Sequence, residues 1–258
     1  YALIYQARRP ILEKAVQAFL QDDKKKAAFL EFEKANSSWL TDYAEFMAIK
    51  EYFGNKALQE WEDKKVVARN EEALDKYRLE LANQIDYYKV TQYFFFSQWK
   101  QLKEYANKHH IKIIGDMPIY VSADSVEVWT KPQLFKLDSE RKPLYVAGVP
   151  ADNFSADGQL WGNPIYDWPE HEKTGYNWWI YRIHESFKLY DVLRIDHFKG
   201  FSDFWQVDGK AEVAKVGTWE PGPGYSLFKA VKETLGDLPI IAEDLGNIDA
   251  KARKLLAD

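Results

Sequence analysis

The fold of this chain is decided by the stretch Leu193-Arg194-Ile195-Asp196-His197-Phe198, together with a second one, Ile240-Ile241-Ala242-Glu243-Asp244-Leu245-Gly246. Each runs from apolar residues into a carboxylate, which is costly to bury without a purpose. Because residues two apart on a strand share a face, Arg194 and Asp196 point the same way, while Leu193 and Ile195 point toward covering helices. The two stretches therefore predict neighbouring strands whose acidic ends open into one site.

A third strand is predicted within 111–120, and helical patterns lie near 175–190 and 225–236, between the strands near 191–198 and 239–245. Strand, helix, strand at such spacings indicates parallel βα units with long loops. A complete (β/α)8 TIM barrel takes about 250 residues, but three or four strands are too few for one. The predicted fold class is therefore α/β, with the middle strands of a TIM barrel preceded by a helical subdomain.

The predicted domains are a helical subdomain over 1–110 and the partial barrel over 111–258. In the first, Asp42 with Glu45 three residues on resembles a capping box at a helix start. From Ile85 a helix is expected to bury a broad face, because its apolar positions recur at three- and four-residue steps. Those positions are Ile85, Tyr88, Phe95, Trp99, Leu102 and Ala106.

Composition excludes several partners. The net charge is −5 without a basic stripe, so nucleic acid is not expected. The absence of cysteine fits a reducing compartment. No apolar run approaches the ~20 residues of a membrane span, and no signal peptide is recognisable. We therefore expect a cytoplasmic protein without a membrane partner. Because the chain opens at Tyr1 and ends within a helix-like run, it is expected to be a piece of a longer protein.

The acidic strand ends carry the predicted chemistry. Arg194 beside Asp196 favours an ionised, oriented carboxylate, which suits a nucleophile, although a structural ion pair is an open alternative. Glu243 follows apolar residues, and burial raises a carboxyl pKa toward the range of a general acid. Asp116, at the end of the first strand, is a third candidate for binding or orientation. Paired carboxylates are the groups used in glycoside chemistry, so a carbohydrate-active enzyme is the first hypothesis.

Five motifs over residues 111–246 resemble, in order, those of the 4-alpha-glucanotransferases, the family of amylomaltase or disproportionating enzyme. They are Ile114 to Tyr120 with Asp124-Ser125 and Val128-Trp129; Ala147 to Ser155 with Gly158 to Pro164; Arg194 to Phe198 with Gly200-Phe201; Gly217-Thr218-Trp219 with Gly222-Pro223-Gly224; and Ala242 to Gly246. Residues 1–110 match more loosely, mainly through Gln92 to Trp99.

The resemblance implies a retaining enzyme that moves α-1,4-glucan segments between sugar acceptors and needs no metal or organic cofactor. Asp196 matches the nucleophile, and Glu243 matches the acid/base that serves the leaving and incoming oxygens. Substrate contacts are implied for Arg194, His197, Asp116 and Tyr120. The five His are scattered apart from the pair His109-His110, so the sequence itself indicates no metal site.

Transfer requires that a sugar acceptor outcompetes water, which aromatic walls around the intermediate would favour. The candidates, for which loop packing is an equal alternative, are Phe154, Trp161, Tyr166, Trp168 and Trp219. Ala151 and Asn153 depart from the family, which usually carries a proline and an aromatic residue there.

The family's third catalytic acid lies in a His-Asp-Asn motif that these 258 residues do not contain. We therefore expect little or no transferase activity from this chain alone, and self-association through unpaired strand edges. Two alternatives stay open, namely an α-glucan hydrolase of the alpha-amylase group and a glycan-binding fragment without catalysis. Donor length, acceptor preference, metabolic context and oligomeric state are not indicated by the sequence.

Overall fold

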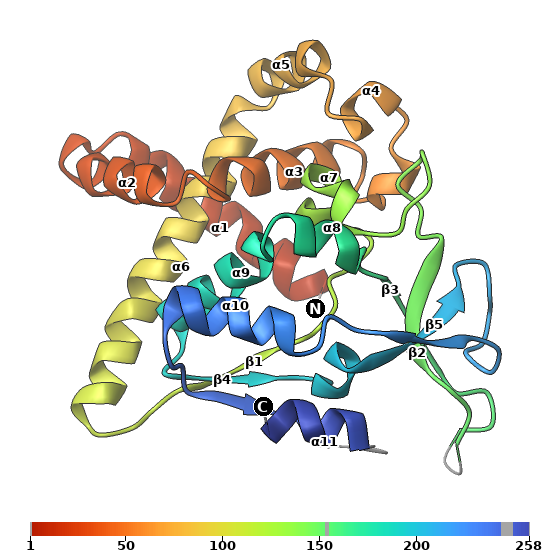
Figure 1. Cartoon of the computed structure of the whole chain (residues 1–258). Helices are drawn as coiled ribbons and strands as arrows, with labels where there is room; N and C mark the ends of the chain where they lie inside the picture. The colour runs from red at the N-terminus through yellow and green to blue at the C-terminus, as the bar shows by residue number, and fades with distance from the viewer. Residues whose placement is uncertain (1, 153–154, 244–249, 258) are drawn as a thin grey trace. The chain divides into compact units, whose positions relative to one another are not determined.

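The computed structural model describes residues 2–152, 155–243 and 250–257 (Figure 1). The chain forms two compact units, Tyr1–Leu102 and Lys103–Asp258. Helix α6, Ala82–Lys108, belongs to both. Each unit is described by itself, and the domain boundary at residue 110 stays a prediction.

The first unit is built from helices, and no strand occurs among its described residues. Asp22 begins α2 by accepting hydrogen bonds from the main-chain N–H groups of Lys24 and Lys25, as an N-cap should. Trp61 and Leu58 lie fully buried in its core. The elements are α1 Ala2–Leu20, α2 Asp23–Ala35, α3 Leu40–Tyr52, η1 Leu58–Glu60, α4 Lys64–Val67, α5 Glu71–Glu80 and α6 Ala82–Lys108.

The predicted capping box at Asp42 is wrong. Helix α3 already begins at Leu40, so Asp42 lies in its first turn, where its carboxylate accepts a 2.7 Å bond from Arg69. Glu45 does not reach back to a helix start either. It is buried and pairs with Arg78 at 2.8 Å. Both acids therefore link α3 to later segments of the same unit.

The apolar stripe of α6 is buried over only part of its length. Ile85 and Tyr88 are less than 9% exposed, as predicted, whereas Phe95 is 47% and Leu102 53% exposed. Periodicity identified the helix correctly, but it does not say how far along the helix a partner extends.

The second unit contains a three-stranded parallel sheet in the order β1-β4-β7, with bounds Ile114–Met117, Val192–Ile195 and Ile240–Ala242. Between β1 and β4, helix α9 (Asn177–Leu189) packs on both strands, and α10 (Tyr225–Leu235) packs on α9 (Figure 1). Leu193 and Ile195 are fully buried, as their alternation predicts. The expectation of a mixed α/β fold with parallel strands is confirmed.

A four-stranded antiparallel sheet, in the order β3-β2-β5-β6, was not predicted. Its strands occupy segments that were expected to be loops after β1 and β4. The central pair, β2 with β5, joins residues far apart in the chain, and such long-range pairing leaves no local signal. Its core is Val146, Val207 and Ala214. The strands are β2 Tyr145–Val149, β3 Gln159–Pro164, β5 Asp203–Asp208 and β6 Thr218–Pro221.

Aromatic side chains fill the remaining core of this unit. Tyr166 is fully buried and Trp168 is 8% exposed, and their rings pack against each other and against Trp179. Loop packing is thus their role, and neither ring offers an open wall. The remaining elements are α7 Val126–Thr130, η2 Pro132–Leu134, α8 Trp168–Lys173, η3 Phe198–Phe201 and α11 Ala250–Ala257.

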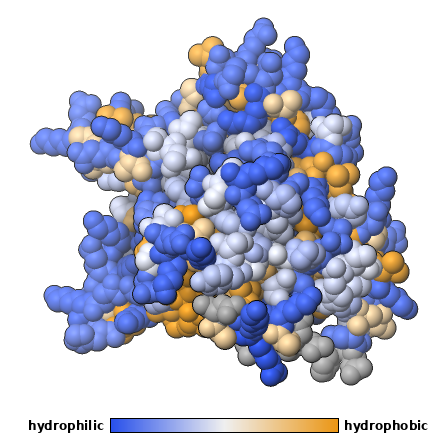
Figure 2. Space-filling model, viewed as in Figure 1, coloured by the Kyte–Doolittle hydropathy of each residue, from blue (hydrophilic) through white to orange (hydrophobic). Residues whose placement is uncertain are grey.

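Hydrophilic side chains cover most of the molecular face that Figure 2 shows, with apolar side chains gathered in a few places. Within the described part of the chain, no helix has the length and hydrophobicity that a membrane crossing requires.

Candidate active site

Arg194 is the centre of an ionic cluster at the carboxyl ends of the parallel strands. Its position on β4 is in register with Asp116 on β1. The Nη1 group lies 2.5 Å from Asp116 Oδ1 and 3.3 Å from Asp196 Oδ1, and Nη2 lies 2.5 Å from Glu243 Oε1. The structure therefore brings together four of the residues that the strand pattern singled out.

Asp196 and Glu243 lie close to each other because the main-chain hydrogen bonds between the parallel strands continue one residue beyond the strand ends. Asp196 N donates to Met117 O and Glu243 N donates to Ile195 O, both at 3.0 Å. Both carboxyl groups bind the same guanidinium, that of Arg194. The Glu243 side chain is 14% exposed, whereas that of Asp196 is 44% exposed.

The pKa of Asp196 is raised, which differs from the expectation that Arg194 would hold it ionised. Burial is the largest cause, and the hydrogen bond and charge of Glu243 act in the same direction. Arg194 opposes them but is outweighed, because its positive charge is divided among three carboxylates. The sequence showed the opposing groups but not which of them would prevail.

His197 follows β4 in the left-handed region, with φ 52° and ψ 47°. Its main-chain N–H donates to Glu243 Oε2 at 2.7 Å, and its imidazole meets the Trp161 ring edge-to-face at 4.8 Å. Burial lowers the pKa of the imidazole, so it is neutral near pH 7. The contact of His197 with Glu243 is through its main chain.

Tyr120 lies in the loop after β1 and is buried, with its ring stacked on Tyr166 at 5.8 Å. Burial raises the pKa of its phenol. Arg182 on α9 fixes this loop by donating to Pro118 O at 2.7 Å and Ile119 O at 3.0 Å. Sequence reasoning missed Arg182, because nothing in a helical pattern distinguishes an arginine that binds carbonyl groups from one in solvent.

The aromatic candidates are in different environments. Trp161 is partly exposed and lies near Tyr120 and His197, at 6.3 and 4.8 Å between ring centroids. Trp219 is 47% exposed, but Lys199 Nζ lies 4.1 Å from its ring centroid. Lys199, which the sequence analysis did not single out, therefore covers one face of that indole. Phe154 lies outside the described residues.

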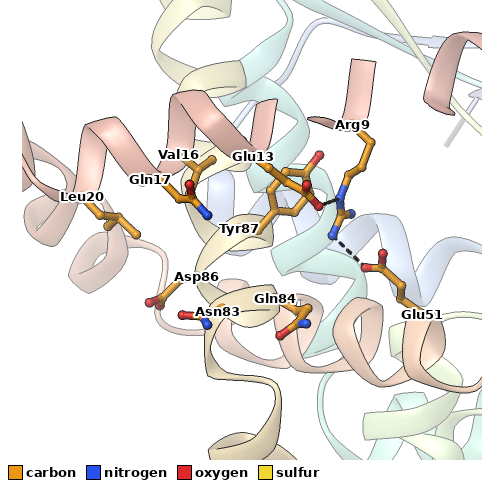
Figure 3. A pocket seen from close by; sticks show the side chains of 10 residues that line it. All are labelled: Arg9, Glu13, Val16, Gln17, Leu20, Glu51, Asn83, Gln84, Asp86 and Tyr87. Carbon is orange, nitrogen blue, oxygen red and sulfur yellow. Dashed lines mark hydrogen bonds and ion pairs between the residues drawn. The ribbon is translucent and has the colours of Figure 1, made fainter. Parts of the chain in front are cut away.

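The helical unit has a pocket of its own, with a volume of about 330 Å³ (Figure 3). None of the predicted site residues lines it. At one end Arg9 bonds Glu13 at 2.7 Å and Glu51 at 3.0 Å, as the dashed lines in Figure 3 mark. Among all the described residues of the chain, no group of three His, Asp or Glu side chains is arranged to hold a metal ion.

Two carboxyl groups bound to one arginine, at the carboxyl ends of parallel strands, resemble the kind of site used on glycosidic bonds. The fold and the site are thus similar to those of the class of α/β carbohydrate-active proteins. A sequence profile described as 4-alpha-glucanotransferase matches residues 1–258. The chain belongs to this family.

Among curated relatives, the 4-alpha-glucanotransferase of Streptococcus pneumoniae is 56% identical over 246 residues, covering 95% of this chain and 48% of the relative. That of Aquifex aeolicus is 46% identical over 255 residues, covering 99% and 51%. The chain thus spans about half the length of these relatives.

Solved structures agree with this assignment. Amylomaltase from Streptococcus agalactiae in complex with acarbose matches with a TM-score of 0.97 and 60% identity, covering all of this chain and 52% of that one. Amylomaltase from Corynebacterium glutamicum matches with a TM-score of 0.68 at 17% identity, covering 95% and 32%, and shows the fold alone.

Proposed function

We propose that this chain carries the carboxylate pair of a 4-alpha-glucanotransferase, which moves α-1,4-glucan segments between sugar acceptors by retaining double displacement. The observation that carries the proposal is that one guanidinium, that of Arg194, bridges both carboxylates, at 3.3 Å from Asp196 Oδ1 and 2.5 Å from Glu243 Oε1. Retaining enzymes place their two carboxyl groups about 5–5.5 Å apart and inverting enzymes about 6.5–9.5 Å, and carboxylates bridged by one guanidinium favour the shorter separation.

Asp196 is the nucleophile and Glu243 the acid/base. Asp196 attacks the anomeric carbon while Glu243 gives its proton to the departing glycosidic oxygen, so a glucosyl ester forms as the glucan leaves. The Glu243 carboxylate then takes the proton of an acceptor hydroxyl, whose oxygen displaces Asp196. The first step requires a proton on Glu243 and an ionised Asp196, and the second step returns a proton to Glu243.

The remaining site residues surround this pair. Asp116 shares Arg194 with it, and Tyr120 and Trp161 form an aromatic corner beside His197. We assign Asp116, Tyr120, Trp161 and Trp219 to glucan contacts, with Trp219 offering the face that Lys199 leaves uncovered. The acarbose bound by the Streptococcus agalactiae protein supports an α-glucan-like ligand.

The sheet is, in this proposal, the middle of a TIM barrel. Its strands follow one another in chain order across the sheet, β1-β4-β7, and α9 connects β1 to β4. Parallel neighbours joined by helices are the repeating unit of that barrel. The likeness to amylomaltase over the whole chain supports this assignment.

The test uses a chimera in which residues 1–258 replace the matching 52% of the Streptococcus agalactiae amylomaltase. With maltotriose, we expect the chimera to make longer glucans and the chain alone to make little or none, because the third acid is supplied only in the chimera. Asp196→Asn and Glu243→Gln should each abolish transfer, while Asp75→Asn, in the helical unit, should not.

Three other outcomes would overturn the proposal or part of it. Glucose and maltose as the only products of the chimera would make the protein an α-glucan hydrolase. Transfer that survives both carboxylate substitutions would remove the assigned roles. Robust turnover by the chain alone would contradict the need for a third acid.

A further inference from the structure

The residue after the nucleophile strand has a backbone conformation that side chains other than glycine rarely adopt. His197 has φ 52° and ψ 47°, where its Cβ approaches the following carbonyl oxygen. Such residues persist where the surroundings over-determine them, and they cluster at functional sites. Two questions follow, namely what holds His197 there and what the conformation achieves.

The imidazole of His197 is packed against two neighbours. Trp161 meets it edge-to-face at 4.8 Å and 88°. Gly200 is the second, where a Cβ would come within 3.1 Å of His197 Cδ2 and 2.8 Å of Ile119 Cδ1. The turn is closed by Gly200 N, which donates to His197 O at 2.9 Å. Packing therefore restricts the position of the imidazole, and a main-chain hydrogen bond closes the turn that carries it.

The conformation directs the main-chain N–H of His197 at Glu243. The donor lies 2.7 Å from Oε2, while Arg194 Nη2 lies 2.5 Å from Oε1. Each oxygen of this one carboxylate thus has its own donor, and two donors at two oxygens fix the plane of a carboxylate. A charge-assisted bond from a main-chain N–H is among the stronger ones available.

We propose that His197 is a positioning residue whose left-handed turn holds its N–H against Glu243, with the imidazole serving to keep the turn in place. This rests on the proposed acid/base role of Glu243. It changes the role implied by resemblance, in which His197 holds the nucleophile and the sugar. The charged groups around the imidazole are Asp196, Lys199 and Asp203. Its lowered pKa leaves the ring neutral, and a packing role requires no charge.

The first test uses the chain itself, labelled with [15N]histidine, which gives five main-chain signals. The His197 signal is assigned by its loss in His197→Asn. An amide proton that donates to a carboxylate resonates further downfield than one that donates to a neutral group, because the charge-assisted bond is stronger. At pH 7 we expect the His197 amide proton to move upfield in Glu243→Gln and to keep its position in Asp75→Asn. An unmoved His197 amide signal in Glu243→Gln would overturn the proposal.

The second test compares two substitutions in the chimera. Both remove the imidazole, but asparagine tolerates left-handed φ whereas valine does not. We expect His197→Asn to keep kcat within about threefold, and His197→Val to lose about 10- to 100-fold in kcat with KM nearly unchanged, the scale of one hydrogen bond to a charged group. Equal losses with a raised KM would show that the imidazole binds sugar, and would overturn the proposal.

Thermal melting checks that each variant folds. If His197→Val does not, His197→Ala replaces it, with an expected loss between those of asparagine and valine. A chimera that is inactive without any substitution would count against the proposed function. The amide spectra would still decide whether the His197 N–H binds Glu243, so the two failures are distinguishable.

Discussion

Each of the two units holds an arginine that pairs with three carboxylates. In the helical unit Arg78 bonds Glu45 at 2.8 Å, Glu71 at 3.0 Å and Asp75 at 2.9 Å. In the second unit Arg194 does the same with residues from three parallel strand ends. Both clusters join one guanidinium to three carboxylates, so the difference between a structural cluster and a reactive one must lie in the arrangement.

At Arg78 the carboxylates are independent of one another. Glu71 and Asp75 are 74% and 68% exposed, and only Glu45 is buried, where it holds the guanidinium with both oxygens. At Arg194, the pKa of Asp196 is raised by burial and by the neighbouring Glu243. The comparison teaches that an acid whose pKa is perturbed by burial and by a second acid, more than the arginine, marks the reactive cluster.

The largest effect expected from this contrast is on catalysis. Lysine keeps the charge of arginine but is a single ammonium that cannot serve three carboxylates in fixed directions. In the chimera we expect Arg194→Lys to lower kcat/KM for transfer about 100- to 1000-fold, or roughly 3–4 kcal/mol of transition-state stabilisation. The measurement is the initial rate of product formation from maltotriose, beside the urea unfolding midpoint of each protein.

Arg78→Lys is the matched control. Because Glu45 is buried, loss of the two-oxygen contact should cost about 1–3 kcal/mol of unfolding free energy while leaving kcat/KM within about twofold. Equal losses of activity in the two variants would remove the distinction between the clusters.

The next effect concerns a buried ionisable group that has no carboxylate beside it. His171 is fully buried among aromatic rings, and burial lowers its pKa to about 4. The unfolded chain, with an ordinary pKa near 6.5, binds the proton first, so stability falls as the pH drops from about 6.5 to 4. The expected loss in wild-type unfolding free energy is about 3 kcal/mol.

His171→Gln checks this, because glutamine is neutral at every pH and can still donate to Leu134 O, the partner of His171 Nε2. Denaturant unfolding at pH 7, 5.5 and 4 should show a much weaker acid loss in the variant, whatever its stability at pH 7. Parallel curves for the two proteins would place the acid sensitivity elsewhere.

The strands and the carboxylate cluster could be predicted because their signals are local. Leu193 and Ile195 show which face of β4 is buried, and the carboxylates Asp196 and Glu243 show where β4 and β7 end. Asp116, Arg194 and Asp196 then meet because parallel strands bring their carboxyl ends to one edge. The register of the parallel strands followed once the alternation of apolar and ionisable residues had assigned each residue to a face of the sheet.

What the sequence could not show was non-local or a balance of opposing effects. The sheet of β2, β3, β5 and β6 forms between two distant segments, and each alone has the composition of a loop. Arg182 acts on main-chain carbonyl groups, which every residue has. The raised pKa of Asp196 results from burial and Glu243, which raise it, acting against Arg194, which lowers it. The left-handed turn at His197 is likewise set by its neighbours and not by the residue type.

The smallest expected effect reports the proton itself. A carboxyl pKa that is raised in the folded state makes the native protein bind more protons than the unfolded chain, so Asp196 lowers stability as the pH rises through its folded pKa. Asp196→Asn removes that cost. Because the side chain is 44% exposed, the gain is reduced by solvent screening, and we expect the melting temperature at pH 7 to rise by only about 1–3 °C.

The gain should shrink as the pH is lowered from 7 to 4, because protonation of wild-type Asp196 removes the cost of its charge. His171 loses stability over the same range, but equally in both proteins, so the difference between their melting temperatures isolates Asp196. Asp75→Asn, beside Arg78, is the control, because its carboxylate extends to solvent at 68% exposure and should give no gain at either pH. A substitution that abolishes transfer while stabilising the fold at neutral pH would show that the carboxylate pair is kept for chemistry at the expense of stability. An Asp196→Asn protein less stable than wild type at pH 7 would show instead that Arg194 holds Asp196 as a structural ion pair, as Arg78 holds Glu45.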